Sequence, residues 1–537
     1  GNGGAIQTYS GTDLSLNHVD FSENHADVGQ GGALYASGTA TLEAVDFSGN
    51  TAQYGGAIMN TGDMTIGGGS SFTNNRAEAG GAIFTLGTLN LNTQDGNILF
   101  SGNTFTDTQE GGADIYLNAD GTVHVNIEGD QNTLSMDGGF AGTGYIDKTG
   151  DNTLVFEESA DNTFFSGTYT QTNGLTQVFA DNFFAGQNNI MNGSVLHFAE
   201  EAFVDHLNVQ TSGRIDLRRT GRFSPNTVTM NDFISDGTAV VAMQTDGTDS
   251  DLLKITGTAT GTVTLDMNAV GSEPTRTQIE VVHVADASSD AVFQLADDAL
   301  DIGAHEYELF QETDTNWYLK TNGDLTKSAQ TVQNLPAMHL SIVNAGLNEL
   351  RKRMGDLRSA DPNAPAGAWM RGYAKHLRIH EKVGAKMDLL GIEGGVDMMM
   401  HALNGRVYLG VMGGYLYADN VHVFQSENPD AKGNAKTPTA GIYATWIGDK
   451  SGWFVDLTAR HFWIRTDLNH IIRNDDINGY DVKRRFWAVT AETGRLFDFK
   501  APSFINVGST HASTITVEPK AEVRYIHGNS KDFMMTL

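Results

Sequence analysis

Short runs of alternating apolar and polar residues, separated by glycine, asparagine and serine, fill residues 1–225. In the segment AGGAIFTLGTLNL, residues 79–91, apolar side chains occupy alternate positions at Ala82, Phe84 and Leu86, and again at Leu89 and Leu91. A period of two residues is typical of a half-buried strand, and these segments lack a helical period. The pattern predicts short β-strands joined by tight corners.

Two motifs recur in this region at a shared interval. Copies of Gly-Gly-Ala followed by Ile, Leu or Asp begin at residues 3, 31, 55, 80 and 111, and copies of Phe-Ser/Thr-x-Asn begin at residues 21, 47, 72 and 100. Successive copies begin 24 to 31 residues apart. Repeats of 20 to 50 residues indicate a solenoid, propeller or array. Glycine permits a positive-φ corner and a close approach of backbones, while Asn can bond to corner backbone groups. We predict a parallel β-helix; the alternative, a flexible Gly/Ser-rich linker, would not keep Phe and Asn in register with the glycines.

Longer alternating strands are expected over residues 226–325, as in DSDLLKITGTATGTVTLDMNAV (249–270) and TQIEVVHVADASSDAVFQL (277–295). The region closes on YELFQETDTNWYLKTN, residues 307–322. Because the last coil of a solenoid exposes unpaired strand edges, we expect this segment to cap the β-helix.

The period changes over residues 326–365. One apolar stripe at helical spacing passes through Val343, Leu347, Leu350, Met354 and Leu357. Pro336 suits a first helical position, so the helix is predicted from Pro336 to Arg358. Such a helix is about 34 Å long, enough to span a bilayer, but its charged residues exclude contact with lipid and place it in a water-filled pore.

Residues 366–537 return to a period of two. In WFVDLTARHFW (453–463), Trp453, Val455, Leu457 and Ala459 lie opposite Asp456, Thr458 and Arg460, and in ITVEPKAEVRY (515–525) one face is again apolar. Strands that are apolar towards lipid and polar towards a lumen, with aromatic residues near their ends, are typical of membrane barrels. The predicted fold class is therefore all-β: a right-handed parallel β-helix over 1–225, a cap over 226–325, a linker helix over 326–365 and an antiparallel transmembrane barrel over 366–537.

Charge separates the two halves. Residues 1–320 hold 9 Lys and Arg against 43 Asp and Glu, a net charge of −34, whereas residues 321–537 carry +3. The acidic half repels nucleic acid and anionic lipid, so no nucleic-acid partner is expected. The chain has no cysteine, which suits a protein that crosses an oxidising periplasm unfolded.

Candidate chemistry is sparse. The pairs Glu157-Glu158, Glu200-Glu201 and Asp297-Asp298 are adjacent on strands and therefore point to opposite faces, so solvated acidic surface is the expected role. The histidines, such as His18, His25 and His124, lack metal-ligand spacing, and the corner Asp246–Asp249 lacks a calcium-binding repeat. We expect no cofactor and no metal. The cluster Lys483–Arg485 is expected at a strand end near lipopolysaccharide.

These motifs resemble those of an autotransporter of Gram-negative outer membranes, the type V secretion pathway. The GGAI, FSEN, FSGN and FTNN repeats are similar to those of polymorphic outer membrane proteins, and TDSDLLKITGTATGTVTLDM with the terminal NWYL resembles the pertactin-type autochaperone module. LNELRKRMGDLR, GAWMRGYA and GIEGGVDMMM resemble the linker helix and first barrel strands. The resemblance implies that the barrel inserts with the help of periplasmic chaperones and the barrel assembly machinery, and that the passenger folds outside the cell.

The resemblance also implies a candidate site of self-cleavage in the linker. Some autotransporters cut this helix by cyclisation of the first of two consecutive asparagines, and the matching positions here are Asn348 and Glu349. The second asparagine is thus replaced. The alternative is that Asn348 and Asn344 hydrogen-bond to groups of the lumen.

Two functions are open at this stage. The chain displays or secretes a passenger that acts as an adhesin or binding stalk for a host-cell or surface ligand, or it belongs to a secreted enzyme, such as a serine protease, whose catalytic domain lies upstream. The continued repeats at Gly1 favour the first. We expect targeting sequence and further coils before Gly1, and further barrel strands after Leu537, because family barrels have twelve strands and about seven are present here.

Overall fold

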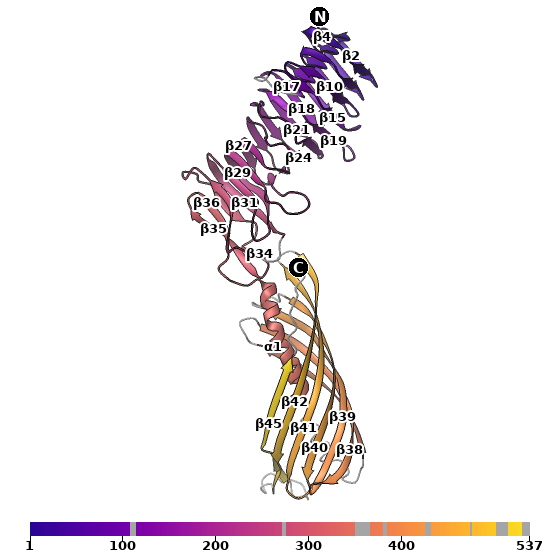
Figure 1. Ribbon diagram of the computed structural model, residues 1–537, viewed down its shortest axis with the longest axis vertical. Coiled ribbons are helices and arrows are strands. Elements are labelled where there is room, and N and C mark those ends of the chain that lie inside the picture. Colours follow the sequence, from indigo (N-terminus) through magenta and orange to yellow (C-terminus); the bar gives the residue numbers. More distant parts are fainter. Residues whose placement is uncertain are drawn as a thin grey trace, which may run out of the picture. The chain divides into compact units, whose positions relative to one another are not determined.

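The computed structural model describes residues 1–107, 114–270, 275–348, 366–379, 384–424, 431–472, 475–500 and 514–528 (Figure 1). It contains two compact units, Gly1–Asp324 and Leu325–Leu537. We call the first the solenoid unit and the second the barrel unit.

The first coils of the solenoid unit contribute strands to three parallel sheets. One sheet contains β1 (Ile6–Gln7), β5 (Leu34–Ala36), β9 (Ile58–Asn60), β13 (Ile83–Thr85), β17 (Ile115–Leu117) and β20 (Phe140–Gly142). A narrower sheet contains β4 (His25–Gln30), β8 (Thr51–Tyr54), β12 (Arg76–Ala77) and β16 (Thr104–Phe105). The third sheet begins with β2 (Asp13–Asn17), β3 (Asp20–Ser22), β6 (Thr39–Glu43), β7 (Asp46–Ser48), β10 (Asp63–Gly67), β11 (Ser71–Thr73), β14 (Thr88–Asn92), β15 (Ile98–Ser101), β18 (Thr122–Asn126) and β19 (Thr133–Met136).

The repeated glycines occupy the corners for two different reasons. The first glycine of the motif has a positive φ, +70° at Gly31 and +63° at Gly55. The second allows two coils to approach closely, because a Cβ on Gly32 would collide with the carbonyl oxygen of Gly56. Both roles confirm the prediction for described copies of the motif. In the fifth copy, residues 111–113 lie outside the described residues.

The phenylalanine and asparagine of the second motif form two columns inside the solenoid. Phe21, Phe47, Phe72 and Phe100 stack with ring centroids 4.9, 5.0 and 4.7 Å apart. Each described asparagine amide bonds to the next coil, as when Asn50 Nδ2 donates to Asn75 Oδ1 at 3.0 Å and to the carbonyl oxygen of Phe21 at 3.0 Å. Buried polar groups are thus satisfied between coils, which explains why the two motifs share one period.

Parallel winding continues beyond the repeats. The strands are β21 (Tyr145–Thr149), β22 (Thr153–Phe156), β23 (Thr168–Gln171), β24 (Leu175–Val178), β25 (Gln187–Ile190), β26 (Val195–Phe198), β27 (Ala202–Gln210), β28 (Arg214–Asp216), β29 (Thr227–Thr245), β30 (Leu252–Ile255), β31 (Ala259–Ala269), β32 (Gln278–Val284) and β33 (Val292–Leu295). β29 alone pairs in parallel with β27 and β28 on one side and with β30 and β31 on the other.

The last strands of the solenoid unit reverse direction. They are β34 (Leu300–Ile302), β35 (His305–Thr313) and β36 (Asn316–Lys320), and β36 pairs antiparallel with both β35 and β32. Trp317 is 6% exposed and packs on Phe293 at 4.8 Å between ring centroids. This hairpin pairs with one edge of β32, and the role of the region as a cap stays a prediction.

The barrel unit consists of one described helix and strands that form a seven-stranded antiparallel sheet with a small hairpin. The helix is α1 (Lys327–Asn348) and the sheet, which we call the barrel sheet, runs in the order β37 (Ala366–Ile379), β38 (Gly384–Ala402), β39 (Gly405–Phe424), β40 (Ala431–Gly448), β41 (Trp453–Ile472), β42 (Asp475–Arg495) and β45 (Lys520–Gly528). The hairpin is β43 (Phe497–Lys500) with β44 (Thr514–Val517).

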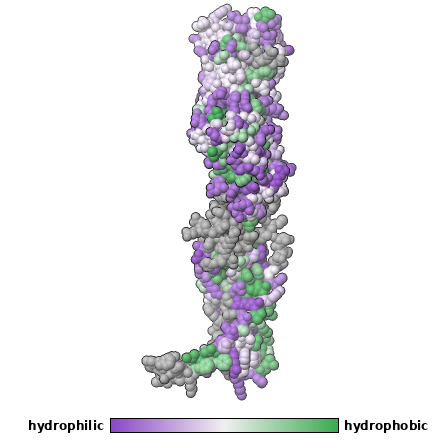
Figure 2. All heavy atoms as spheres, turned by 90° about the vertical axis from the view of Figure 1, so that its left-hand side faces the viewer, coloured by the Kyte–Doolittle hydropathy of each residue, from purple (hydrophilic) through white to green (hydrophobic). Residues whose placement is uncertain are grey.

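Side chains of the barrel sheet alternate between two environments. On β41, Trp453 and Leu457 are 45% and 49% exposed, whereas Asp456 and Arg460 are 8% and 1% exposed. The apolar positions therefore face outward and the polar positions face α1, as predicted. Figure 2 shows that green apolar residues gather along the barrel unit.

Three details of the sequence prediction are wrong. The helix begins at Lys327, directly after Thr326, whose Oγ1 accepts a hydrogen bond from the Ala329 N–H at 3.2 Å as an N-cap does. Pro336 therefore lies inside the helix, although it removes one backbone donor. Leu350, Met354, Leu357 and the predicted end at Arg358 lie outside the described residues. The segment 515–525 is two strands, since Glu518 and Pro519 separate β44 from β45, and proline cannot donate to the ladder.

The third correction concerns Lys483–Arg485, which lies well inside β42 and not at a strand end. β42 has 21 residues, about twice the length that a tilted membrane strand requires. In the described part of the chain, no helix is long and apolar enough to span a bilayer.

Candidate functional site: the lumen of the barrel sheet

The concave face of the barrel sheet holds α1. Its apolar side chains are buried against side chains from several strands, and this cluster contains Leu335, Met338, Ile342, Val343, Ala345 and Leu347 from α1 with Met387, Leu389, Leu416, Phe462, Ile464 and Phe486 from the sheet. Gly346 permits the closest approach, because a Cβ there would lie 3.0 Å from a ring carbon of Phe462. Val343 and Leu347 thus confirm the buried side of the predicted helical stripe.

Basic side chains from the wall bind the C-terminal part of α1. Lys375 Nζ donates to the carbonyl oxygen of Ala345 at 2.8 Å, and Arg460 Nη1 donates to the carbonyl oxygen of Gly346 at 3.3 Å. Both carbonyls lie in the last described turn of α1. Lys375 and Arg460, which we call the cationic collar, therefore hold this part of α1 against the wall of the lumen.

An ion cluster positions Arg460. Glu393 lies between two guanidinium groups, with Arg371 Nη2 and Arg460 Nη2 each 2.7 Å from its carboxylate oxygens, and the Glu393 and Arg460 side chains are each 1% exposed. Arg460 Nη2 also donates to Thr439 Oγ1 at 2.7 Å. Buried charges require such pairing, because each loses its hydration. The cluster fixes the arginine that contacts the helix.

Further polar pairs fill the lumen beside this cluster. Tyr443 donates to Asp397 at 2.6 Å, Lys520 pairs with Glu492 at 2.9 Å, and Thr458 bonds to Thr490. The inward positions that the sequence assigns to a polar lumen are thus hydrogen-bonded across neighbouring strands. The concave face of the barrel sheet is thus filled by a helix and by paired side chains.

The direction of α1 follows from its contacts with β41. His339 is buried and its Nε2 lies 2.8 Å from Thr466 Oγ1, whereas Gly346 contacts Phe462 and Arg460. Going along α1 towards its C-terminus therefore means going along β41 towards Trp453. The chain that precedes α1 leaves the lumen at the end where β41 passes into β42.

The predicted cleavage pair is only partly within the described chain. Asn348 is the last described residue of α1, and Glu349 lies outside the described residues. Asn344 Oδ1 accepts from Arg524 Nη1 at 3.4 Å, as in the alternative in which linker asparagines bond to lumen groups. The cationic collar was missed by the sequence analysis, although Arg460 was correctly placed on the lumen face, because alternation does not reveal which partner a side chain meets.

The solenoid unit shows acidic surface where the sequence predicts it, because Glu157, Glu158, Glu200, Glu201, Asp297 and Asp298 are all exposed. Their predicted place on strands, with side chains on opposite faces, is wrong, since each pair lies at a turn or bend outside the strands. His18 and His25 are exposed, and His124 lies 3.7 Å from Asp147. At the corner Asp246–Asp249, the Asp246 carboxylate accepts from backbone N–H groups of Thr248 and Asp249. Among the residues that the structure describes, no group of His, Asp and Glu could hold a metal ion.

The fold and the lumen define a class of protein: a β-solenoid followed by a helix that lies in the concave face of an antiparallel sheet like the wall of a barrel. Three family models match the chain. Residues 368–536 match the autotransporter beta-domain, residues 204–321 match pertactin, and residues 69–86 match the Chlamydia polymorphic membrane protein repeat. The C-terminal strands thus match an autotransporter beta-domain and the solenoid unit a pertactin-like passenger, and these matches indicate a location in the outer membrane with the passenger at the surface or released.

Relatives include adhesive and proteolytic proteins. The BrkA autotransporter of Bordetella pertussis is 30% identical over 46% of this chain and 24% of BrkA. The autotransporter adhesin/invasin TibA of Escherichia coli is 24% identical over 92% of this chain and 51% of TibA, and the serine protease EspP of Escherichia coli is 26% identical over 57% of this chain and 22% of EspP. The chain thus spans about half or less of the length of these relatives.

Proposed function

We propose that the solenoid unit is an adhesive stalk, held at the bacterial surface because α1 stays in the pore as a plug and tether. The barrel sheet supplies the anchor in outer-membrane lipid and lipopolysaccharide. The observation that carries this proposal is the direction of α1, which leads the preceding chain out of the lumen at one defined end.

We assign the end of the barrel sheet where β41 passes into β42 to the external side, because the strands extend far beyond the membrane there. β40 joins β41 through Asp449–Gly452, a short turn, and the outward face of β41 is bounded by Trp453 and Trp463. Ten residues of tilted strand cover about 25 Å, the height of the apolar band of an outer-membrane barrel. The rest of β41 therefore projects beyond the membrane opposite the short turn, and barrels of this kind have short turns in the periplasm.

Surface chemistry supports the adhesive role of the solenoid unit. Outward positions of successive coils carry the same kinds of polar side chain in register, as where Ser71 pairs with Asp46 and Gln53 donates to Glu78 at 3.1 Å. Such a surface offers repeated weak contacts to a host-cell or surface ligand. TibA, whose match covers 92% of this chain, is an adhesin/invasin.

Cells that express the chain test this role. Bacteria displaying the full chain are expected to adhere to host-cell monolayers, and adhesion is expected to disappear after an external protease removes the solenoid unit from intact cells. Equal adhesion before and after this treatment, with removal verified by immunoblot, would contradict the proposal.

Tethering also makes a chemical prediction at Asn348. Because Glu349 replaces the second asparagine of the cleavage motif, we propose that α1 remains intact and that the passenger stays attached. N-terminal analysis of the purified outer-membrane form checks this. A fragment beginning at Glu349 would instead establish cleavage between Asn348 and Glu349.

Assembly is proposed to depend on periplasmic chaperones and the barrel assembly machinery. The reason is the outward face of the barrel sheet, where residues such as Leu457, Val489 and Val523 are 49%, 49% and 73% exposed and require protection from water before insertion. The enzyme alternative has the support of the match to the serine protease EspP, which covers 22% of EspP.

A further inference from the structure

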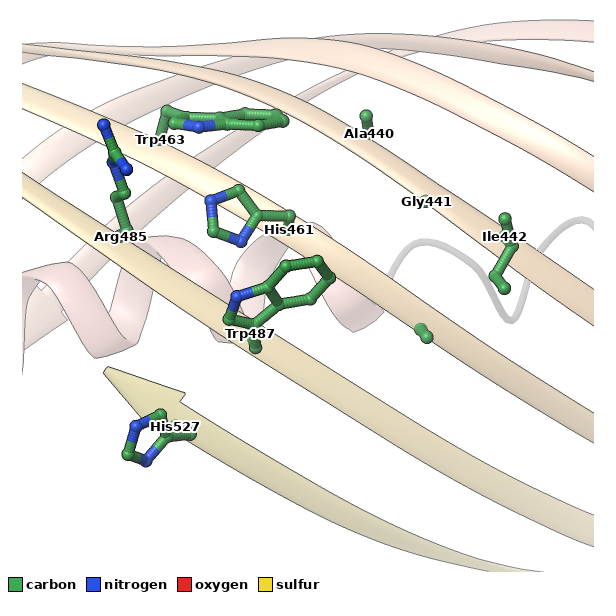
Figure 3. A pocket seen from close by; sticks show the side chains of 9 residues that line it. Ala440, Gly441, Ile442, His461, Trp463, Arg485, Trp487 and His527 are labelled. Atoms are coloured by element: carbon green, nitrogen blue, oxygen red, sulfur yellow. The ribbon is translucent and has the colours of Figure 1, made fainter. Parts of the chain in front are cut away.

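A hollow of ≈ 1000 Å³ lies on the outward face of the barrel sheet, across β40, β41, β42 and β45 (Figure 3). Its floor contains small residues, Ala440, Gly441 and Ala459. Large side chains surround the floor: His461, Trp463, Arg485, Trp487 and His527. The small floor under a rim of large side chains leaves space for another molecule.

Strand alternation shows that these side chains point away from α1. Phe462 and Phe486 are buried against the helix, so their neighbours Trp463 and Trp487 point outward and are 40% and 56% exposed. Trp487 lies opposite His461 on one side and His527 on the other. The hollow therefore faces the surroundings of the barrel and not its lumen.

The position of the hollow along the strands places it at the outer boundary of the membrane. Trp453 lies at the short-turn end of β41, and Trp463 is ten residues further along the same face. This separation corresponds to about 25 Å, so Trp463 and Trp487 occupy the upper aromatic girdle, where lipid headgroups begin.

The rim of the hollow is positively charged. Arg485 forms no ion pair with any described residue, and no lining residue that the structure describes is acidic. By contrast, Arg465 pairs with Asp467 at 3.6 Å and Lys520 pairs with Glu492 at 2.9 Å. An unpaired guanidinium beside lipid favours an anionic group.

His461 provides a second, independent indication. It is 7% exposed, and its ring lies between Trp463 and Trp487, with centroids 4.3 Å from each. Its Nδ1 atom is buried and lacks a hydrogen-bond partner among the described residues. Buried polar atoms are normally satisfied, so an additional partner is expected there.

From this geometry we propose that the hollow binds a phosphate of lipid A, the phosphorylated glycolipid of the outer leaflet. Arg485 binds the phosphate as a charge-assisted fork, His461 and His527 supply further hydrogen bonds, and Trp463 and Trp487 pack on the sugar and the first methylenes of the acyl chains. The proposal rests on insertion of the barrel sheet in the outer membrane as described under Proposed function.

Native mass spectrometry of the full chain, extracted from outer membranes in mild detergent and titrated with bis-phosphorylated lipid A, tests the site. Arg485→Gln is expected to weaken lipid A binding about tenfold, because one charge-assisted interaction is lost. Arg485→Lys keeps the charge but lacks the forked guanidinium, so its affinity for lipid A is expected to lie between those of the wild type and Arg485→Gln. The matched control is Arg495→Gln, which removes an arginine beside Trp453 at the other end of the sheet.

Two further arms identify the source of the phosphate. Dephosphorylated lipid A should bind the wild type as weakly as lipid A binds Arg485→Gln, and inorganic phosphate should not compete at equimolar concentration. Equal binding by wild type and Arg485→Gln, equal loss in Arg495→Gln, or full competition by inorganic phosphate would each overturn the proposal.

Cell fractionation and heat-modifiable migration distinguish failure of the lipid A site from failure of the barrel unit to insert in the outer membrane. A wild-type chain that reaches the outer membrane but binds no lipid A contradicts the lipid site alone. A wild-type chain that does not reach the outer membrane contradicts the anchor itself. If Arg485→Gln does not assemble, His527→Gln replaces it, and unchanged lipid A binding by both His527→Gln and Arg485→Lys would again overturn the site.

Discussion

Single buried polar residues determine how the coils of the solenoid unit are joined. The asparagine column continues through Asn103, whose Nδ2 donates to Asp114 Oδ1 at 2.9 Å, and the other carboxylate oxygen accepts from the N–H groups of Gly138 and Gly139. Burial raises the pKa of the Asp114 carboxyl to about 7, although its hydrogen bonds lower it. Burial similarly raises the pKa of Asp251 to about 6.

These two carboxyls predict a pH dependence of stability. Their pKa values are higher in the folded chain than in the unfolded chain, so their favourable contribution is complete below about pH 4 and is lost as the pH rises through about 6 for Asp251 and about 7 for Asp114. The free energy of unfolding should therefore decrease from pH 5 to pH 8, by roughly 1 kcal/mol per pH unit for each group within its window. Pulse proteolysis in urea at several pH values measures this change.

Asp114→Asn is expected to reduce that slope, since the residue no longer titrates. Asp27→Asn, at an exposed position of the same unit, serves as the control and should keep the wild-type slope. An unchanged slope in Asp114→Asn would show that its carboxyl does not titrate in the folded state as proposed.

Lys148 satisfies backbone groups inside the solenoid. Its Nζ donates to the carbonyl oxygens of Gly150, Asn152 and Asn173 at 2.9, 2.8 and 2.8 Å. Lys148→Met keeps the stem but removes these donors, and we expect a loss of about 2 kcal/mol in the free energy of unfolding. The exposed Lys254→Met should change it by less than about 0.5 kcal/mol. Urea midpoints from pulse proteolysis compare the two, and equal midpoints would contradict this role.

At the scale of elements, α1 depends on the wall of the lumen. An isolated helix with a proline in its interior is poorly stable, but here apolar packing and the cationic collar offset that cost. The contact between Arg460 and Gly346 connects the ion cluster of Glu393 to the end of the helix.

Arg460→Met should loosen this plug. It removes one partner of a buried ion cluster, a change that typically costs about 3–5 kcal/mol, and it removes the donor to the carbonyl oxygen of Gly346. We expect a larger single-channel conductance in planar bilayers. Arg465→Met, on the outward face of the same strand, should conduct as the wild type does. The reverse order of conductances would refute the role of the collar.

The sequence predicted the elements whose signal is local or repeated. The motifs that contain Gly32 and Phe47 recur at nearly constant intervals, and apolar residues alternate with polar ones around Leu457. The buried or exposed side of these residues could therefore be assigned without a structure. Tertiary contacts were not predictable. The packing of α1 on the sheet joins residues far apart in the sequence, and the contact of Arg460 with Gly346 joins residues 114 positions apart.

At the scale of the whole molecule, the two halves suit different surroundings. The net charge of −34 in residues 1–320 favours solubility and repels anionic lipid. Residues 321–537, with a net charge of +3, contain the outward apolar side chains and Arg485, which has no ion pair with a described residue. The charge division thus agrees with a barrel unit in the membrane and a solenoid unit in water.

Thiol labelling of intact cells tests the central claim most directly, because the chain has no cysteine of its own. Ser15 is exposed in the solenoid unit, and Ser451 is exposed in the short turn between β40 and β41. With a maleimide that does not cross the outer membrane, Ser15→Cys should be labelled in intact cells, and Ser451→Cys should be labelled only after permeabilisation. Labelling of Ser451→Cys but not Ser15→Cys in intact cells would contradict the display of the solenoid at the surface.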